Sequence, residues 1–131
     1  MGFHERKVNK FLFGSKSKFS DICYDIVTKF KNEYTNIQRI FVRAEYPIIS
    51  NNYYNYLKEI YEDSYFYSKK LISNKFSYIR RNQVMIDESD ICIFYFNNNY
   101  TCKTKSGTRI AYEYAIRKGK KILNLYKNKA R

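Results

Sequence analysis

Short apolar runs alternate with segments of helical spacing along this chain, and that alternation limits the possible folds more than any other feature. The runs "FLF", "IFV", "ICIFYF" and "KILNLY" predict four strands, at residues 11–13, 40–42, 91–96 and 121–126. Continuous apolar character is typical of strands covered on both faces. Strands that alternate with helices form parallel βαβ units with right-handed crossovers. We therefore expect an α/β fold of three layers, with a mainly parallel sheet of about four or five strands between helices.

Four segments predict the helices. The first has apolar residues on helical spacing, namely Ile22, Cys23, Ile26, Val27 and Phe30. The others cover residues 51–61 and 75–90 and the stretch that starts at Ser106, for which Gly119 is the natural C-cap. The stretch after residue 61 is interpreted as an aromatic connection. At 131 residues the chain has the length of one domain, so we expect a single domain over residues 1–131, with a flexible leader at residues 1–7.

The formal net charge of +13 predicts anionic partners, such as a nucleotide, a nucleic acid or an acidic protein surface. The basic residues are spread along the chain, which weakens the case for a dedicated nucleic-acid face. No apolar run has the length of a membrane span, and the N-terminus "MGFHERKVNK" lacks the apolar core of a signal peptide. These features predict a soluble, cytoplasmic protein that does not bind membranes.

Cysteine and histidine are too few and too scattered for a zinc site. Cys23, Cys92 and Cys102 form no CxxC pair, and His4 is the single histidine. Cys23 and Cys92 lie in apolar stretches and are interpreted as small core residues, whereas Cys102 lies in a polar loop. We expect neither a metal ion nor a cofactor.

Two loops rich in small and hydroxyl residues follow predicted strands. Gly14, Ser15 and Ser17 follow the first strand, and Ser106, Gly107 and Thr108 follow the third. Each serine has a structural interpretation as a helix N-cap. The functional interpretation is an anion site, because the amides at a helix N-terminus bind phosphate and ligands of open parallel sheets bind beyond the carboxyl ends of the strands. Two such loops at one sheet edge favour the anion site, although neither GxGxxG nor GxxxxGK[ST] is present.

The C-terminal half resembles the SLOG superfamily of Rossmann-like proteins, which includes the "lonely guy" phosphoribohydrolases and the DNA-processing protein DprA. The resemblance is greatest to small uncharacterised bacterial and phage members with an "RNxxMxDxSD" helix, an apolar strand, an "SGT" turn and a "YA" helix. The matching residues here are Arg81, Asn82, Met85, Asp87, Ser89, Asp90, Ser106, Gly107, Thr108, Tyr114 and Ala115. The "FGS" that ends the first strand is similar to the glycine turn that opens the pocket of this family.

This resemblance implies a Rossmann-like fold and a nucleotide held between the first glycine loop and the "SGT" helix. In the phosphoribohydrolases an arginine and a glutamate carry the hydrolysis. Arg81 matches the arginine, but Ala111 stands where the glutamate is expected, and Glu113 is turned away by roughly 200° of helix. The resemblance therefore implies binding and leaves hydrolysis in doubt.

The leading expectation is a module that binds a nucleotide or nucleotide-derived signal, as a sensor or a sequestering protein. The expected ligand-binding residues are Gly14, Ser15, Lys16, Ser17, Arg81, Asn82, Ser106, Gly107, Thr108 and Arg109. The alternatives are a nucleoside 5'-monophosphate phosphoribohydrolase, with Arg81 and Glu113 as the only catalytic candidates, and a DprA-like nucleic-acid protein whose tyrosines stack on bases.

Several of these residues also have an ordinary structural interpretation. Arg81 and Arg109 are either solvated or face a phosphate, and the amide of Asn82 either bonds neighbouring backbone or contacts the ligand. Asp87 is expected to make hydrogen bonds in a loop. Glu113 is expected on an exposed or interface face, paired with Arg117.

The middle segment "YYNYLKEIYEDSYFYSKK" has more aromatic side chains than one crossover helix readily buries. Exposed aromatic patches usually mark an interface. We therefore expect a homo-oligomer whose contact uses Tyr54, Tyr61, Tyr65 or Phe66.

Overall fold

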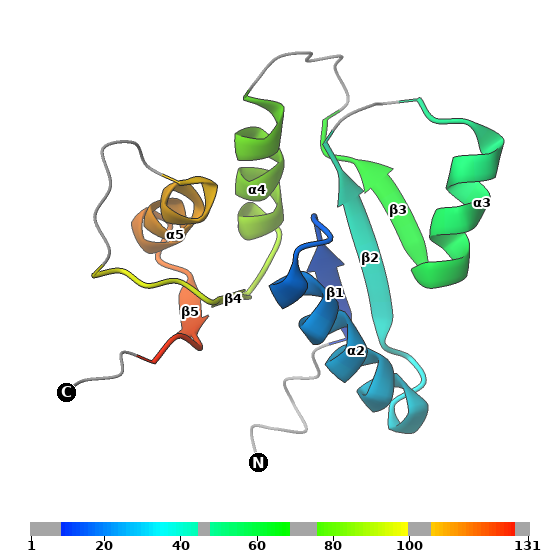
Figure 1. Ribbon diagram of the computed structural model, residues 1–131, viewed down its shortest axis with the longest axis horizontal. Coiled ribbons are helices and arrows are strands. Elements are labelled where there is room, and N and C mark those ends of the chain that lie inside the picture. The colour runs from blue at the N-terminus through cyan, green and yellow to red at the C-terminus, as the bar shows by residue number, and fades with distance from the viewer. Residues whose placement is uncertain (1–8, 45–47, 69–75, 100–105, 128–131) are drawn as a thin grey trace. The chain divides into compact units, whose positions relative to one another are not determined.

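The computed structural model describes residues 9–44, 48–68, 76–99 and 106–127. Helices alternate with strands throughout (Figure 1), in the order β1 (Lys10–Phe13), α2 (Lys18–Glu33), β2 (Gln38–Arg43), α3 (Asn51–Ile60), β3 (Asp63–Phe66), α4 (Ser77–Asp87), β4 (Ile91–Phe94), α5 (Gly107–Arg117) and β5 (Lys121–Asn124). Every strand pairing is parallel. The predicted α/β class with parallel strands is therefore confirmed.

The chain divides into two compact units, Met1–Leu71 and Ile72–Arg131, called unit 1 and unit 2 below. Each unit has its own sheet: β1-β2-β3 in unit 1 and β4-β5 in unit 2. The expected leader, His4 and Cys102 lie outside the described residues.

In unit 1 both helices pack on one face of the sheet. The core cluster joins Val27 of α2 and Leu57 of α3 to Phe13, Ile37, Phe41 and Tyr61. Phe13 and Phe41 are paired in the parallel register and so point to the same face. Right-handed crossovers between strands in consecutive order explain why α2 and α3 share that face.

Two expectations about unit 1 need correction. The aromatic connection after α3 contains strand β3, which has no continuous apolar run and pairs through the register Phe41↔Ser64. The apolar positions of α2 also do not form one buried face, because Val27 is buried whereas Ile22, Ile26 and Phe30 are about half exposed. A helix against a sheet buries only a narrow stripe, and the wider apolar arc of α2 exceeds it.

One of the expected interface tyrosines belongs to this core. Tyr61 is 5% exposed and packs edge-on against Tyr24 and tilted against Phe41. Burial raises the pKa of Tyr61 to about 12. Tyr61 is therefore not available for a contact with another chain, whereas Tyr54 is exposed and the homo-oligomer stays a prediction.

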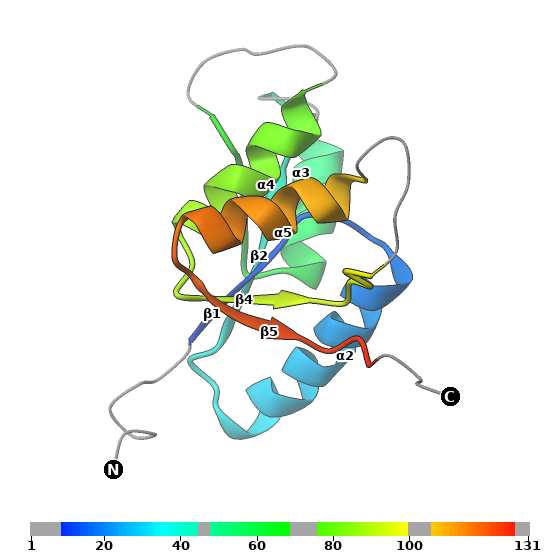
Figure 2. The same cartoon turned by 90° about the vertical axis from the view of Figure 1, so that its left-hand side faces the viewer.

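In unit 2, α4 and α5 pack together on one side of β4 and β5 (Figure 2). Ile86 of α4, Cys92 of β4, and Ala111 and Ala115 of α5 form the core cluster. The alanines permit the close approach of helix and sheet. Strand β4 is not buried on both faces as expected, since Ile91 and Ile93 are exposed while Cys92, on the face toward α5, is buried.

Gly119 ends α5 as predicted. Its φ of +69° lies in the left-handed region, which costs a glycine little. The amide of Gly119 donates to the carbonyl of Ile116, and the amide of Lys120 donates to that of Ala115. These two bonds form a Schellman motif, and the chain turns directly into β5. Within the described residues, no helix combines the length and the apolar character needed to cross a lipid bilayer.

Candidate ligand-binding site

The loop after β1 is organised by its serines. Ser17 is the N-cap of α2, and its hydroxyl accepts a hydrogen bond from the amide of Ser20 at 3.2 Å. The hydroxyls of Ser15 and Ser20 lie 3.0 Å apart. Lys16 contacts α3, where its Nζ lies 3.4 Å from the hydroxyl of Tyr56 and 5.1 Å from the centre of that ring. The capping interpretation is therefore confirmed for Ser17, and Lys16 lies on Tyr56.

The "SGT" turn forms the N-terminus of α5. Ser106 is the N-cap, and its hydroxyl accepts from the amide of Arg109 at 3.0 Å. Gly107 and Thr108 occupy the first helical positions and are exposed. Among the residues that the structure describes, a Cβ added at Gly107 would have no atom within 4 Å. The first amides of a helix have no partner within the helix, and here the approach to the backbone at Gly107 is open.

Arg109 lies on the same first turn and interacts within unit 2. Its guanidinium is 5.6 Å from the centre of the Phe96 ring, and its Nη1 is 3.6 Å from a carboxylate oxygen of Glu113. The predicted pairing of Glu113 with Arg117 is therefore wrong. A cation four residues before the carboxylate takes that place, while Arg117 lies over the ring of Tyr114.

Arg81 is buried rather than solvated. It is 6% exposed, its Nε donates to the side-chain oxygen of Asn82 at 2.9 Å, and its guanidinium lies 5.5 Å from the centre of the Tyr78 ring. The amide side chain of Asn82 thus orients a buried cation, a role that neither interpretation of Asn82 anticipated.

Helix α5 crosses from β4 to the parallel strand β5, so it runs back along them and begins toward the carboxyl end of β4. Near the C-terminal ends of α4 and α5, the hydroxyl of Tyr114 donates to the carboxylate of Asp87 at 2.8 Å. Nζ of Lys120 donates to the carbonyl of Asp87 at 3.2 Å, so Asp87 makes the structural hydrogen bonds expected of it.

The carboxyl end of β5 has a residue that the sequence analysis missed. The side-chain oxygen of Asn124 accepts from the amides of Phe96 and Tyr126, at 3.0 and 3.2 Å, and its nitrogen donates to the carbonyl of Phe96 at 2.8 Å. These bonds extend the β4–β5 pairing past the last strand residue. The only signal in the sequence was an asparagine inside an otherwise apolar run.

The carboxyl ends of β2 and β3 have two further residues without a sequence signal. Arg43 is 8% exposed, and its Nε donates to the hydroxyl of Ser64 at 3.3 Å. Tyr67 is 6% exposed, and among the described residues its buried hydroxyl has no hydrogen-bond partner. A buried hydroxyl without a partner destabilises the folded state.

Replacement of Tyr67 by phenylalanine is expected to leave the free energy of unfolding unchanged or to raise it by up to about 1 kcal/mol, because a desolvated hydroxyl is removed. The matched control is Tyr24→Phe. The hydroxyl of Tyr24 donates to the carbonyl of Ile60 at 2.6 Å and accepts from Arg39 at 3.2 Å. Loss of this hydroxyl is expected to lower the free energy of unfolding, measured with urea, by about 1–2 kcal/mol. Equal destabilisation by the two changes would contradict the assignment.

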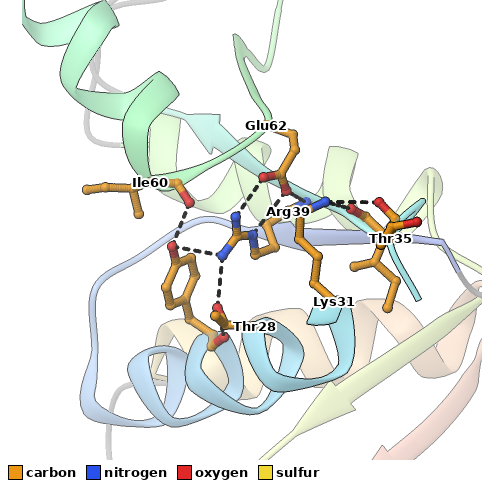
Figure 3. Close-up of polar contacts among 8 residues, drawn as sticks. Thr28, Lys31, Thr35, Arg39, Ile60 and Glu62 are labelled. Atoms are coloured by element: carbon orange, nitrogen blue, oxygen red, sulfur yellow. Dashed lines mark hydrogen bonds and ion pairs between the residues drawn. The ribbon is translucent and has the colours of Figure 1, made fainter. Parts of the chain in front are cut away.

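A network of polar side chains lies at the opposite end of the unit 1 sheet (Figure 3). Nη2 of Arg39 lies 2.6 Å from one carboxylate oxygen of Glu62, and Nε lies 3.0 Å from the other. Nη1 of Arg39 donates to Thr28 of α2 at 2.9 Å. Arg39 lies near the start of β2, and Glu62 directly precedes β3, so this network ties the amino ends of two strands to a helix.

The charges of this pair shift each other's pKa. Partial burial raises the pKa of Glu62, but the hydrogen bonds from the side chain and amide of Arg39 outweigh it, and the net pKa is lowered. The bond to Glu62 raises the pKa of Arg39. Lys31 completes the region by donating to the carbonyls of Thr35 and Ile37, at 3.2 and 2.7 Å. Each of these three charged side chains has a hydrogen-bond partner, which indicates that the network has a structural role.

The structure thus places the predicted residues in two groups. Gly14, Ser15, Lys16 and Ser17 lie in unit 1, and Arg81, Asn82, Ser106, Gly107, Thr108 and Arg109 lie in unit 2. The thiols of Cys23 and Cys92 have their pKa raised by burial, as suits core residues. The described residues include no group of three His, Cys, Asp or Glu side chains placed to share a metal ion. Comparisons of the chain with protein-family models, with curated proteins and with solved structures found no match.

Proposed function

We propose that this protein binds a nucleotide or a nucleotide-derived signal molecule, as a sensor or sequestering module, through the N-terminal turn of α5. The observation that carries the proposal is the N-terminus of α5. There an exposed glycine and an exposed threonine begin a helix of 11 residues, with open space above the glycine backbone. Such a terminus combines outward amides with the positive end of the helix dipole.

In the proposed mechanism, phosphate oxygens of the ligand accept hydrogen bonds from the amides of Gly107 and Thr108 and from the Thr108 hydroxyl. Ser106 holds the turn in place through its bond to the amide of Arg109. Arg109 and the buried Arg81 add positive charge to unit 2. In unit 1, Ser15, Lys16 and Ser17 form a second candidate anion site by themselves, beside the N-terminus of α2. The net charge of +13 favours the approach of an anion.

Binding without hydrolysis is favoured by the surroundings of the two positions where a catalytic carboxylate was considered. Ala111 is 7% exposed and packs in the unit 2 core. Glu113 lies 3.6 Å from Arg109. A carboxylate that already contacts a cation is a poor candidate for the proton transfer that hydrolysis needs.

The test is Gly107→Ala. The added methyl group meets no atom of the described residues, so the free energy of unfolding should stay the same or rise by up to about 0.5–1 kcal/mol. It does obstruct a phosphate that approaches the backbone. We expect the affinity for the best ligand of a panel of AMP, ADP, NAD and cyclic nucleotides to fall about tenfold or more in isothermal titration calorimetry, as for the loss of two charge-assisted hydrogen bonds.

The charge control is Lys121→Ala, which removes an exposed cation at the amino end of β5. It should leave nucleotide affinity within about twofold, because exposed charges beyond a Debye length are largely screened. Absence of binding by every nucleotide at millimolar concentration, or equal losses in both variants, would refute the proposal. Free base released from AMP by the wild-type protein would replace it with hydrolysis.

A further inference from the structure

Phe96 follows β4 and is held more firmly than a loop residue normally is. Its amide and its carbonyl both bond the side chain of Asn124, at 3.0 and 2.8 Å. The amide of Leu125 donates to the carbonyl of Phe94 at 2.8 Å, so the segments that follow β4 and β5 begin as a continuation of the strand pairing. The backbone that carries the Phe96 ring is therefore fixed by hydrogen bonds after the strand has ended.

The ring of Phe96 belongs to a small cluster at the carboxyl end of β4. It lies 5.0 Å from the ring of Tyr112, centre to centre, and Tyr112 packs edge-on against Phe94 at 5.2 Å. The guanidinium of Arg109 lies 5.6 Å from the centre of the Phe96 ring. Phe96, Tyr112 and Arg109 are all partly exposed, so the cluster reaches the surface and is not part of the closed core.

This cluster adjoins the first turn of α5, since Arg109 belongs to that turn. In a nucleotide, base and phosphate are separated by one ribose, a distance of the same order as the pitch of a helix, about 5.4 Å. Aromatic rings and guanidinium groups are the two side-chain types on which bases stack. A site that binds only phosphate would need neither the fixed ring of Phe96 nor the ring of Tyr112 beside it.

We propose that Phe96 and Arg109, supported by Tyr112 and Asn124, form a stacking site for the base of the ligand. The ligand class is thereby narrowed to phosphorylated molecules that carry a planar base, and sugar phosphates are disfavoured. This inference rests on the proposed function, because the base site adjoins the phosphate-binding turn of that proposal. It adds Phe96, Tyr112 and Asn124 to the residues that act in binding.

The experiment compares AMP with ribose 5-phosphate, which keeps the sugar and the phosphate but lacks the base. Wild-type protein should bind AMP about tenfold or more tightly, the size expected for one stacked base. Phe96→Leu keeps an apolar side chain but loses the flat ring. It should reduce the affinity for AMP about tenfold and leave that for ribose 5-phosphate within about twofold. Phe96→Tyr should restore AMP binding.

The matched control is Tyr95→Leu. Tyr95 is the adjacent aromatic residue, 56% exposed, and its ring packs edge-on against Tyr126 at 5.4 Å. Side chains alternate along the strand, so Tyr95 lies on the other face from Phe94 and Phe96. Tyr95→Leu should leave the affinities for AMP and for ribose 5-phosphate within about twofold of the wild-type values, because stacking needs direct contact with the ring. Because both ligands are measured on the same variant, a loss of fold would lower both affinities and be recognised.

Equal affinity of the wild-type protein for AMP and ribose 5-phosphate would overturn the base site while leaving phosphate binding intact. Parallel losses for both ligands in Phe96→Leu, with an unchanged free energy of unfolding, would overturn it too. If neither ligand nor any other nucleotide binds the wild-type protein, the proposed function fails and the base site fails with it. Gly107→Ala separates the two proposals, since it should weaken both ligands.

Discussion

Arg39→Ala is expected to lower the free energy of unfolding by about 2–3 kcal/mol, somewhat less than the cost of removing one partner from a fully buried ion pair. The substitution removes both bonds to Glu62 and the bonds to Thr28 and Tyr24. The Arg39 side chain is 12% exposed and that of Glu62 is 27% exposed, so water replaces these bonds only in part. Urea unfolding at pH 7, followed by circular dichroism, measures the change.

Two further variants separate the geometry of this network from its charge. Arg39→Lys keeps the cation but loses the planar fork that matches a carboxylate, so it should recover less than half of the loss. Arg80→Ala removes an exposed arginine that bonds Gln83 on the surface of α4, and it should cost no more than about 0.5 kcal/mol. A similar cost for Arg39→Ala and Arg80→Ala would show that the partly buried pair of Arg39 and Glu62 adds no special stability.

Glu62→Gln is expected to cost about 2 kcal/mol at pH 7 and to remove part of the acid sensitivity of the fold. The pKa of Glu62 is lowered in the folded protein from an ordinary value of 4.5. A carboxylate with a lowered pKa contributes stability that is fully present above its unfolded pKa and is lost as the pH falls through its folded pKa. The difference between wild type and variant should therefore be constant from pH 7 to about pH 5 and shrink below about pH 4.5.

Urea unfolding of both proteins at several values between pH 3 and pH 7 tests this dependence. Glu59→Gln is the matched control, because Glu59 is an exposed carboxylate on α3. Its difference from wild type should stay within about 0.5 kcal/mol at every pH. A gap between wild type and Glu62→Gln that widens as the solution becomes more acidic would contradict the assigned direction of the pKa shift.

The network and the proposed binding groups lie at opposite ends of the unit 1 strands. Arg39 and Glu62 join the amino ends of β2 and β3 to α2, whereas Ser15, Lys16 and Ser17 follow the carboxyl end of β1. Parallel strands place all their carboxyl ends at one edge, and the loops there are the ones that vary with function. The amino edge is therefore suited to the interactions that stabilise the unit.

The competing functions lead to different observations. Hydrolysis would release free base from AMP, and of the two positions considered for a catalytic carboxylate, one is a core alanine and the other a glutamate that contacts Arg109. Binding of single-stranded nucleic acid would use exposed tyrosines and would weaken steeply with salt. A nucleotide held by helix amides and one base site should show a much smaller salt dependence, because few counterions are displaced.

Most elements of the fold could be predicted from the sequence because their signals are local. The apolar runs at β1, β2, β4 and β5 and the helical spacing in α2 to α5 depend on neighbouring residues alone. Strand β3 could not be found in this way, because "DSYF" shows neither a continuous apolar run nor a clear alternation. It becomes a strand through its register with β2, which lies far from it in the sequence.

The same division applies to the candidate site. The N-caps Ser17 and Ser106 and the C-terminal Gly119 were predictable, because each acts on an amide or carbonyl within the adjacent turn. The pairing of Glu113 with Arg109 was also local. However, Arg109 lies four residues before Glu113 and Arg117 four residues after it, and periodicity does not choose between them.

The sequence by itself determined the α/β class, the order of most elements and the capped turns whose amides and hydroxyls are proposed to bind phosphate. Only the tertiary structure decided that Arg39 meets Glu62, that Asn124 holds Phe96, and that Arg81 and Tyr61 are buried. The physical reason is that these partners are joined by strand register and helix packing. A side chain's periodicity shows which face it occupies, but the partner on that face is set by residues brought there from elsewhere in the chain.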